Sequence, residues 1–243
     1  MKNKILLMML TLGASTLAFA GADDNEVWLQ QSGTALTLNI TQKGYGNKVG
    51  GDDFSGTSID MLLTGATNSL TLVQFGDSNK LYGPFIADTS TVNLTFTGDS
   101  NSMDWNVGYQ GSADNLNMLG AVTGSSNTFD IDVGYDQSAE YLNWDLVVGG
   151  SSNVFTTKID SDNAVWNRTV TGSTNDINTI QADATDNKIT AVLTGSGNDI
   201  DIIQKSGSDT GCPNGQSCSG IIDVTFVTSN GNIDIVQKDD NDT

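Results

Sequence analysis

Hydrophobic and polar residues alternate along short segments that recur through the whole chain. In the clearest segment, residues 59–74, every second position is apolar on either side of a turn at Thr64-Gly65. Alternation with a period of two predicts β-strands that bury one face. Aligning the chain on the turn glycine gives eight repeats, in which this position holds Gly33, Gly65, Gly98, Gly124, Gly150, Gly172, Gly195 and Thr228.

Repetition of about 22 residues predicts a solenoid, in which each unit buries its apolar side chains by stacking on its neighbours. The sequence therefore predicts an all-β fold, a β-solenoid (β-helix) of about eight two-stranded coils over residues 25–240. Longer gaps between turns predict edge-loop insertions at 43–57, 79–90 and 205–220. Residues 21–243 are expected to form a single domain.

Two columns of amides accompany the apolar columns, where a column is the set of residues at the same position in successive coils. Stacked amides can hydrogen-bond along the solenoid axis, which satisfies polar groups that are costly to bury. We predict a stacking ladder made of Asn68, Asn101, Asn127, Asn153, Asn175 and Asn198 at the turn and Gln42, Gln74, Gln181, Gln204 and Gln237 in the second strand.

The spacing of glycine, asparagine and glutamine resembles the repeat of curlin, the subunit of bacterial curli fibres, which runs Gln-x-Gly-x-Gly-Asn-x-Ala-x-x-x-Gln. Residues 42–47 (Gln-Lys-Gly-Tyr-Gly-Asn) match its first half, and residues 74–79 (Gln-Phe-Gly-Asp-Ser-Asn) nearly do. Where curlin has a glutamine two residues before the glycine, this alignment has mainly aliphatic residues. The resemblance implies an exported solenoid that assembles into fibres, and the more apolar core favours a solenoid that folds as a monomer.

The first 20 residues have the pattern of a secretory signal peptide. Lys2 and Lys4 precede an apolar run, and Ala18-Phe19-Ala20 forms a cleavage box. The run is too short for a membrane anchor, and no later run of about 18 apolar residues follows. We therefore expect an extracellular or cell-surface protein, exported through a cleaved signal peptide, without membrane insertion.

The chain is strongly acidic, with a formal net charge of −19 that becomes −21 when residues 1–20 are removed. Nucleic acid is therefore not an expected partner, since its binding depends on basic contacts to phosphate. An outward column places aspartates on neighbouring coils, where they form either a solvated face that suppresses association or a Ca²⁺-binding ladder. The residues of that column are Asp104, Asp130, Asp201 and Asp234. No other cofactor is expected.

The remaining chemistry is sparse. Cys212 and Cys218 lie six residues apart, and in an exported protein they predict a disulfide that closes a small loop. The chain has no histidine, and its single arginine, Arg168, falls on an inward column, which predicts a local register slip in that coil or a carboxylate partner at the coil edge. We expect no enzymatic activity.

Two functions fit these patterns. The first is an exported structural subunit of a curli-like extracellular fibre, acting in surface adhesion and biofilm matrix, with end-to-end self-association or a fibre nucleator as the partner. The alternative is a monomeric secreted β-solenoid that binds a surface polysaccharide or a cell-surface partner through its edge loops.

Overall fold

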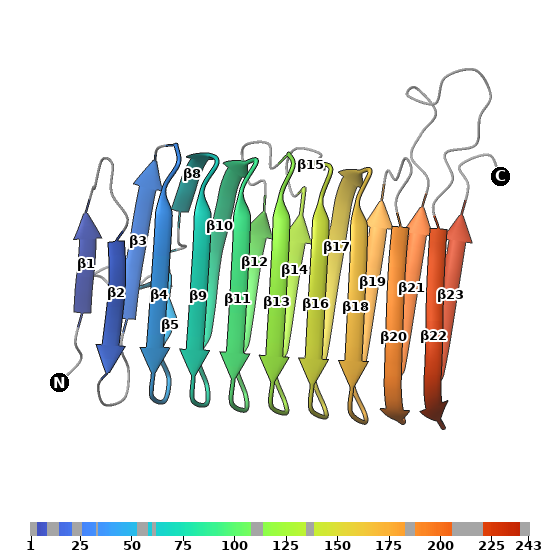
Figure 1. Cartoon of the computed structure of the whole chain (residues 1–243). Coiled ribbons are helices and arrows are strands. Elements are labelled where there is room, and N and C mark those ends of the chain that lie inside the picture. Colours follow the sequence, from blue (N-terminus) through green and yellow to red (C-terminus); the bar gives the residue numbers. More distant parts are fainter. Residues whose placement is uncertain are drawn as a thin grey trace, which may run out of the picture.

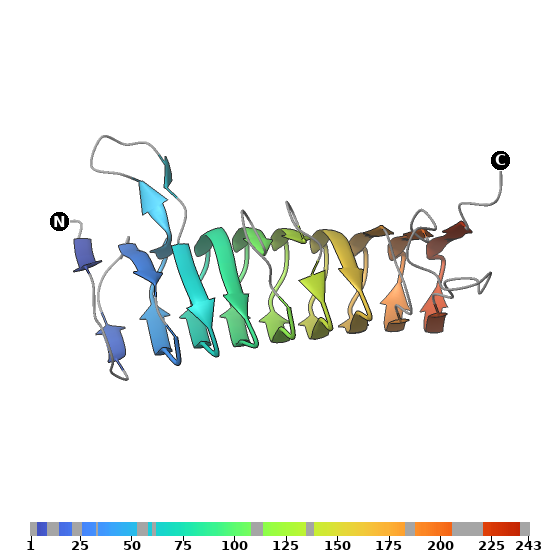
Figure 2. The ribbon, with the colours of Figure 1, turned by 90° about the horizontal axis from the view of Figure 1, so that it is seen from above.

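The structure is a computed structural model of the whole chain, and it describes residues 4–8, 15–20, 26–32, 34–52, 58–59, 62–107, 114–134, 139–182, 188–205 and 221–238. The described residues form two long parallel sheets that face each other along a straight solenoid (Figure 1). Seen from above, the chain winds from one sheet to the other and back in each coil (Figure 2). The predicted all-β solenoid is therefore confirmed.

The nine-stranded sheet contains one strand from each coil. In spatial order its strands are β2 (Ser15–Ala20), β4 (Thr37–Lys43), β9 (Ser69–Phe75), β11 (Thr91–Thr97), β13 (Asn117–Thr123), β16 (Asn143–Gly149), β18 (Val165–Thr171), β20 (Lys188–Ser196) and β22 (Ile221–Ser229).

The twelve-stranded sheet contains the return strands. Its main path is β1 (Lys4–Met8), β3 (Glu26–Ser32), β5 (Lys48–Val49), β10 (Lys80–Asp88), β12 (Ser102–Val107), β14 (Thr128–Val133), β17 (Val154–Asp162), β19 (Asp176–Ala182), β21 (Asp199–Lys205) and β23 (Asn232–Lys238). Two short strands join it from the side, β8 (Leu62–Ala66) beside β3 and β10, and β15 (Ala139–Glu140) beside β17.

The number of coils differs slightly from the predicted eight, because β1 and β2 add a coil ahead of residue 25. β1 pairs in parallel with β3, and β2 pairs in parallel with β4. Both strands fall within the segment that the sequence identifies as a signal peptide. The cleavage of that segment stays a prediction.

The first two repeats were aligned half a coil out of place. β11 pairs with β9 so that Thr97 lies opposite Phe75, which makes Gly76, and not Gly65, the equivalent of Gly98. By the same register β4 pairs with β9, and Gly44 replaces Gly33. The error has a physical origin: both half-coils consist of an alternating strand followed by a tight turn, so a shift of 11 residues preserves the apolar pattern.

This correction also changes the insertions. Residues 79–90 do not form an edge loop, since β10 is one of the regular strands of the twelve-stranded sheet. The insertion predicted at 43–57 begins later, because β5 pairs with β3 and β10 in the twelve-stranded sheet. After it, β6 (Gly51–Asp52) pairs with β7 (Ser58–Ile59) in a separate antiparallel sheet, which projects from the solenoid in Figure 2. Almost all of the insertion predicted at 205–220 lies outside the described residues.

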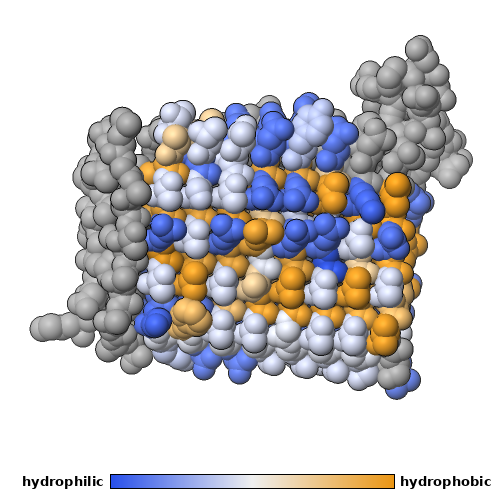
Figure 3. Space-filling model, viewed as in Figure 1, coloured by the Kyte–Doolittle hydropathy of each residue, from blue (hydrophilic) through white to orange (hydrophobic). Residues whose placement is uncertain are grey.

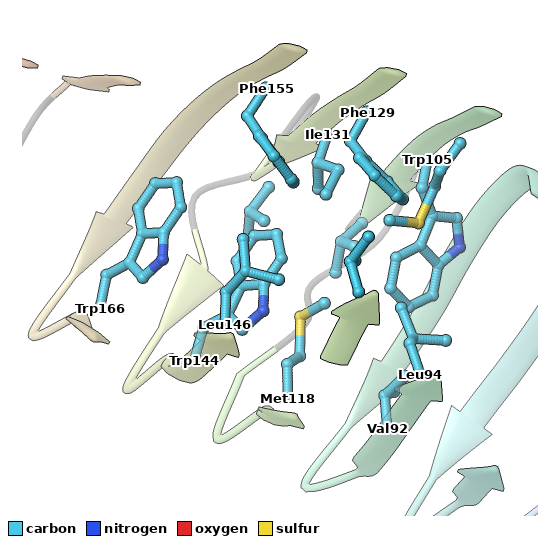
Figure 4. Close-up of a cluster of buried hydrophobic side chains, with 14 of the residues drawn as sticks. Val92, Leu94, Trp105, Met118, Phe129, Ile131, Trp144, Leu146, Phe155 and Trp166 are labelled. Carbon is cyan, nitrogen blue, oxygen red and sulfur yellow. The ribbon is translucent and has the colours of Figure 1, made fainter. Parts of the chain in front are cut away.

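The core fills the space between the two sheets with large side chains stacked from coil to coil (Figure 4). The rings of Phe129 and Phe155 are parallel at a centroid distance of 4.9 Å, and those of Trp144 and Trp166 at 5.1 Å. Parallel in-register pairing produces these stacks, because it places equivalent residues of successive coils one strand spacing apart.

The backbone geometry of the turn explains why this position holds glycine. Gly98 has a φ of +129°, and a Cβ at this position would collide with the carbonyl group of Gly76 in the preceding coil. Only glycine tolerates both the positive φ and the close approach. The turn glycines therefore allow successive coils to approach at the spacing of their paired strands.

Arg168 lies in the core without a register slip, and its hydrogen-bond partner among the described residues is a hydroxyl and not a carboxylate, so neither predicted arrangement is observed. β18 pairs in regular register with both neighbours, and Arg168 lies opposite Leu146 and Ala191. The guanidinium donates a hydrogen bond from Nη2 to the hydroxyl of Thr179 at 2.6 Å and lies over the ring of Trp166, 4.2 Å from its centroid. Burial lowers the pKa of Arg168 to about 9.

Replacement of Arg168 by methionine should stabilise the solenoid. An apolar side chain of similar length removes the desolvation cost of a buried cation, and such replacements raise the free energy of unfolding by about 1–4 kcal/mol. Urea unfolding followed by tryptophan fluorescence measures the difference. Arg168→Ala is the matched control, and it should unfold at lower urea than Arg168→Met because it leaves a cavity beside Ala191. A methionine variant less stable than the parent would show that the contacts of Arg168 with Thr179 and Trp166 outweigh its burial.

Candidate functional site

A continuous asparagine ladder runs along one corner of the solenoid, at the third position after each turn glycine. In each step, the backbone N–H of one asparagine donates to Oδ1 of the asparagine in the next coil. The distances are 2.8 Å from Asn101 to Asn127 and 3.0 Å from Asn127 to Asn153. The ladder contains Asn47, Asn79, Asn101, Asn127, Asn153, Asn175 and Asn198, all of them buried.

Asn68 does not belong to this ladder, which corrects the sequence alignment. It lies at the opposite corner, where its backbone N–H donates to Oγ of Ser90 at 3.1 Å and its Oδ1 accepts from the backbone N–H of Leu36. Asn47 and Asn79 occupy the expected places instead. The signal for them was in the sequence, since both close the curlin-like segments 42–47 and 74–79.

The glutamines form two short ladders on opposite sheets rather than one. In the nine-stranded sheet, Nε2 of Gln74 donates to Oε1 of Gln42 at 2.7 Å. In the twelve-stranded sheet, Gln204 donates to Gln181 at 2.8 Å and Gln237 to Gln204 at 3.0 Å. The half-coil misalignment had placed all five in a single column.

Aliphatic and aromatic residues replace glutamine in the middle coils. Phe96 follows Gln74 in one column, and Ile159 precedes Gln181 in the other. Within the described part of the chain, Oε1 of Gln74 and Nε2 of Gln181 consequently have no hydrogen-bond partner. The glutamine columns therefore lie toward the two ends of the solenoid, and aliphatic or aromatic residues occupy their positions in the middle coils.

The last described coil leaves its inward side chains uncovered. Ile235 in β23 occupies the same column as Ile202 in β21, and its exposed fraction is 44% against 1% for Ile202. Ile222, Val224 and Phe226 in β22 are only partly buried, although they continue apolar core columns. Among the described residues nothing packs on this coil, so it presents an apolar surface and two strand edges.

The aspartate column lies on the outer face of the twelve-stranded sheet. Asp104 lies opposite Asp130, and Asp201 opposite Asp234. Burial, together with the charges of Asp132 and Asp104, raises the pKa of Asp130, and burial with the charges of Asp199 and Asp234 raises that of Asp201. In the described ranges, no three acidic, histidine or cysteine residues are grouped so that they could hold a metal ion.

Several sequence predictions are not tested by this geometry. Cys212 and Cys218 lie outside the described residues, so their disulfide stays a prediction. No described segment is a helix of the length and hydrophobicity needed to span a membrane. Comparison with protein families, curated proteins and solved structures gives no match to this chain.

Asn153→Ala should destabilise the solenoid by about 2 kcal/mol or more, because buried groups that lose their partner cost about 1–3 kcal/mol each. The substitution removes the acceptor for both the backbone N–H and Nδ2 of Asn127. Urea unfolding measures the change. The exposed pair of Asn143 and Asn117 serves as the control, and Asn143→Ala should change stability by less than about 0.5 kcal/mol. Equal effects of the two variants would contradict a structural role for the buried ladder.

Asp130→Asn should stabilise the protein at pH 7. Because the pKa of Asp130 is raised on folding, its carboxyl binds a proton more tightly in the folded state than in the unfolded state. The charged carboxylate therefore lowers stability when the pH is above the folded pKa. This destabilisation vanishes below the unfolded pKa of 3.8. We expect a gain of about 0.2–1 kcal/mol at pH 7 that disappears below pH 3.8. Asp223→Asn removes the same charge from the nine-stranded sheet. An equal gain in that control would assign the effect to net charge alone.

Proposed function

We propose that the chain is an exported structural subunit of a curli-like extracellular fibre, which acts in surface adhesion and biofilm matrix. The observation that carries the proposal is the uncovered last coil, where Ile235 is 44% exposed at a core position. An open solenoid end exposes both apolar surface and unpaired strand edges, and such edges pair with further strands.

The register at the two ends supports stacking of one copy on the next. Once residues 1–20 are removed, β3 is the first strand of the twelve-stranded sheet and β23 is its last. Gln31 and Gln237 belong to the same column of the twelve-stranded sheet. At one end of this column Gln31 pairs with Leu63, and at the other end Gln204 pairs with Gln237. Pairing β23 with β3 of another copy in the same backbone register would place Gln237 opposite Gln31.

The resemblance to curlin supports the same function. The structure moves the two best-matching segments, residues 42–47 and 74–79, into the register of the later turn glycines. In this register Gln42 and Gln74 lie two residues before Gly44 and Gly76, as the curlin repeat requires. The correction therefore brings the first coils closer to that repeat than the original alignment did.

Fibre formation by residues 21–243 tests the proposal. We expect unbranched fibres at micromolar concentration, observed by negative-stain microscopy at pH 7 and pH 4.5 with parallel thioflavin-T fluorescence. Ile235→Asp should lower the elongation rate at least tenfold, because the junction would bury an unpaired carboxylate. Val236→Asp adds the same charge to the neighbouring outward position, which is 38% exposed, and should change the rate less than threefold.

Two outcomes would overturn parts of this proposal. Discrete rods of monomer size under every condition would exclude the fibre subunit and favour the alternative, a monomeric solenoid that binds a surface polysaccharide or cell-surface partner. Fibres that elongate equally fast from Ile235→Asp would keep the structural function but exclude the last coil as the junction.

A further inference from the structure

The two outer faces of the solenoid carry very different charges. The face of the twelve-stranded sheet has an excess of negative charge: its outward lysines with described side chains are Lys48, Lys80 and Lys158, against the aspartates Asp104, Asp130, Asp132, Asp176, Asp199, Asp201 and Asp234. The strands β4 to β22 of the nine-stranded sheet place only four charged residues outward, Lys43, Asp145, Lys188 and Asp223, which cancel. In a chain of net charge −19, one broad face is therefore neutral.

Apolar side chains are exposed on this neutral face. Leu119 and Val147, in the neighbouring strands β13 and β16, are 43% and 53% exposed near the middle of the sheet. Val192 and Val227 continue the pattern toward β22. Figure 3 shows separate apolar groups across this face, among weakly polar and strongly hydrophilic ones.

The outward residues of the face are mostly threonine and valine in two adjacent columns. Because the strands pair in register, each column forms a straight ridge along the solenoid, with a groove between neighbouring ridges. One of these columns consists of the residues three positions before the turn residue of each coil, and none of them is charged. They are Thr41, Val73, Thr95, Ala121, Val147, Thr169, Val192 and Thr225.

The face is large enough for a stable interface. Eight strands at the usual spacing of about 4.8 Å, each of about seven residues at 3.3 Å, make a surface of about 38 by 23 Å, or ~900 Å². Stable protein complexes bury about 800 Å² on each partner. The exposed apolar residues lie within this area, among uncharged threonines and asparagines, so contact between two such faces would remove them from water.

We propose that the face of the nine-stranded sheet binds the same face of a second copy, so that two solenoids associate side by side. A second copy fits because the face carries no net charge, so two identical faces can meet without electrostatic repulsion, and because the face is as large as a stable interface requires. The same arrangement directs both acidic faces outward, about as far apart as the complex allows. This lateral contact is separate from the end-to-end contact of the fibre, and neither requires the other.

Sedimentation of residues 21–243 carrying Ile235→Asp tests the lateral contact, because that substitution removes the end junction. We expect a monomer–dimer equilibrium in the micromolar range. Adding Val147→Asp should raise the dissociation constant at least tenfold, since two carboxylates would then be buried near the centre of the interface. The matched control is Thr156→Asp, which adds the same charge to the outer face of β17 in the opposite sheet and should change the dissociation constant less than threefold. Circular dichroism checks that each variant keeps its strands.

A monomer at all concentrations up to 100 μM would overturn the proposal, as would a dimer that Val147→Asp leaves unchanged. Sedimentation with an insoluble polysaccharide such as cellulose identifies another occupant. Binding to it that Val147→Asp abolishes, with no dimer present, would assign the face to a carbohydrate surface and also overturn self-association. Since the fibre is assayed separately in the chain without Ile235→Asp, either contact can fail alone.

Discussion

Parallel pairing between equivalent residues of successive coils is the constraint on which the rest of the structure depends. The strands of successive coils pair in the same register, so each residue lies opposite the residue at the same position of the next coil, and in many columns the two are of the same type. Aromatic rings then meet aromatic rings, and a buried asparagine meets the next asparagine. The corner asparagines and turn glycines reinforce this register, because a shift by one residue would leave the asparagine amides unsatisfied and force a Cβ against a carbonyl group.

Much of this arrangement could be predicted from the sequence, because a stacked core repeats its chemistry at a fixed interval. The columns from Gly98 onward agree with the observed pairing residue for residue. The first two coils were misplaced because the two halves of a coil have the same apolar pattern, although Asn47 and Asn79 in the curlin-like segments distinguish them. Arg168 was misjudged because a rule against buried cations cannot foresee that Thr179 and the ring of Trp166 receive the guanidinium.

The candidate site divides in a similar way. Hydrogen-bonded amide pairs follow from residue type and spacing, so the partners of Gln204 and Asn153 could be anticipated. The exposure of Ile235 could not, because a sequence does not reveal which coil lacks a neighbour. The amino-acid composition alone does not predict that one face is neutral. The charge of a face depends on which of two alternating positions points outward and on the sheet to which the strand belongs. Solenoids separate charge in this manner at little cost, because the outward positions do not contribute to the core.

The strands at the two ends of the solenoid decide which sheet stays continuous when copies stack end to end. In a chain without residues 1–20 the end strands would be β3 and β23, which both belong to the twelve-stranded sheet, so the chain from one to the other contains a whole number of coils plus one half. When copies stack through these strands, the twelve-stranded sheet runs on without interruption. The nine-stranded sheet does not, because one strand position between β22 of one copy and β4 of the next stays vacant. A filament of this chain is thus continuous along one side and notched once per molecule along the other, and each notch has the width of a single strand.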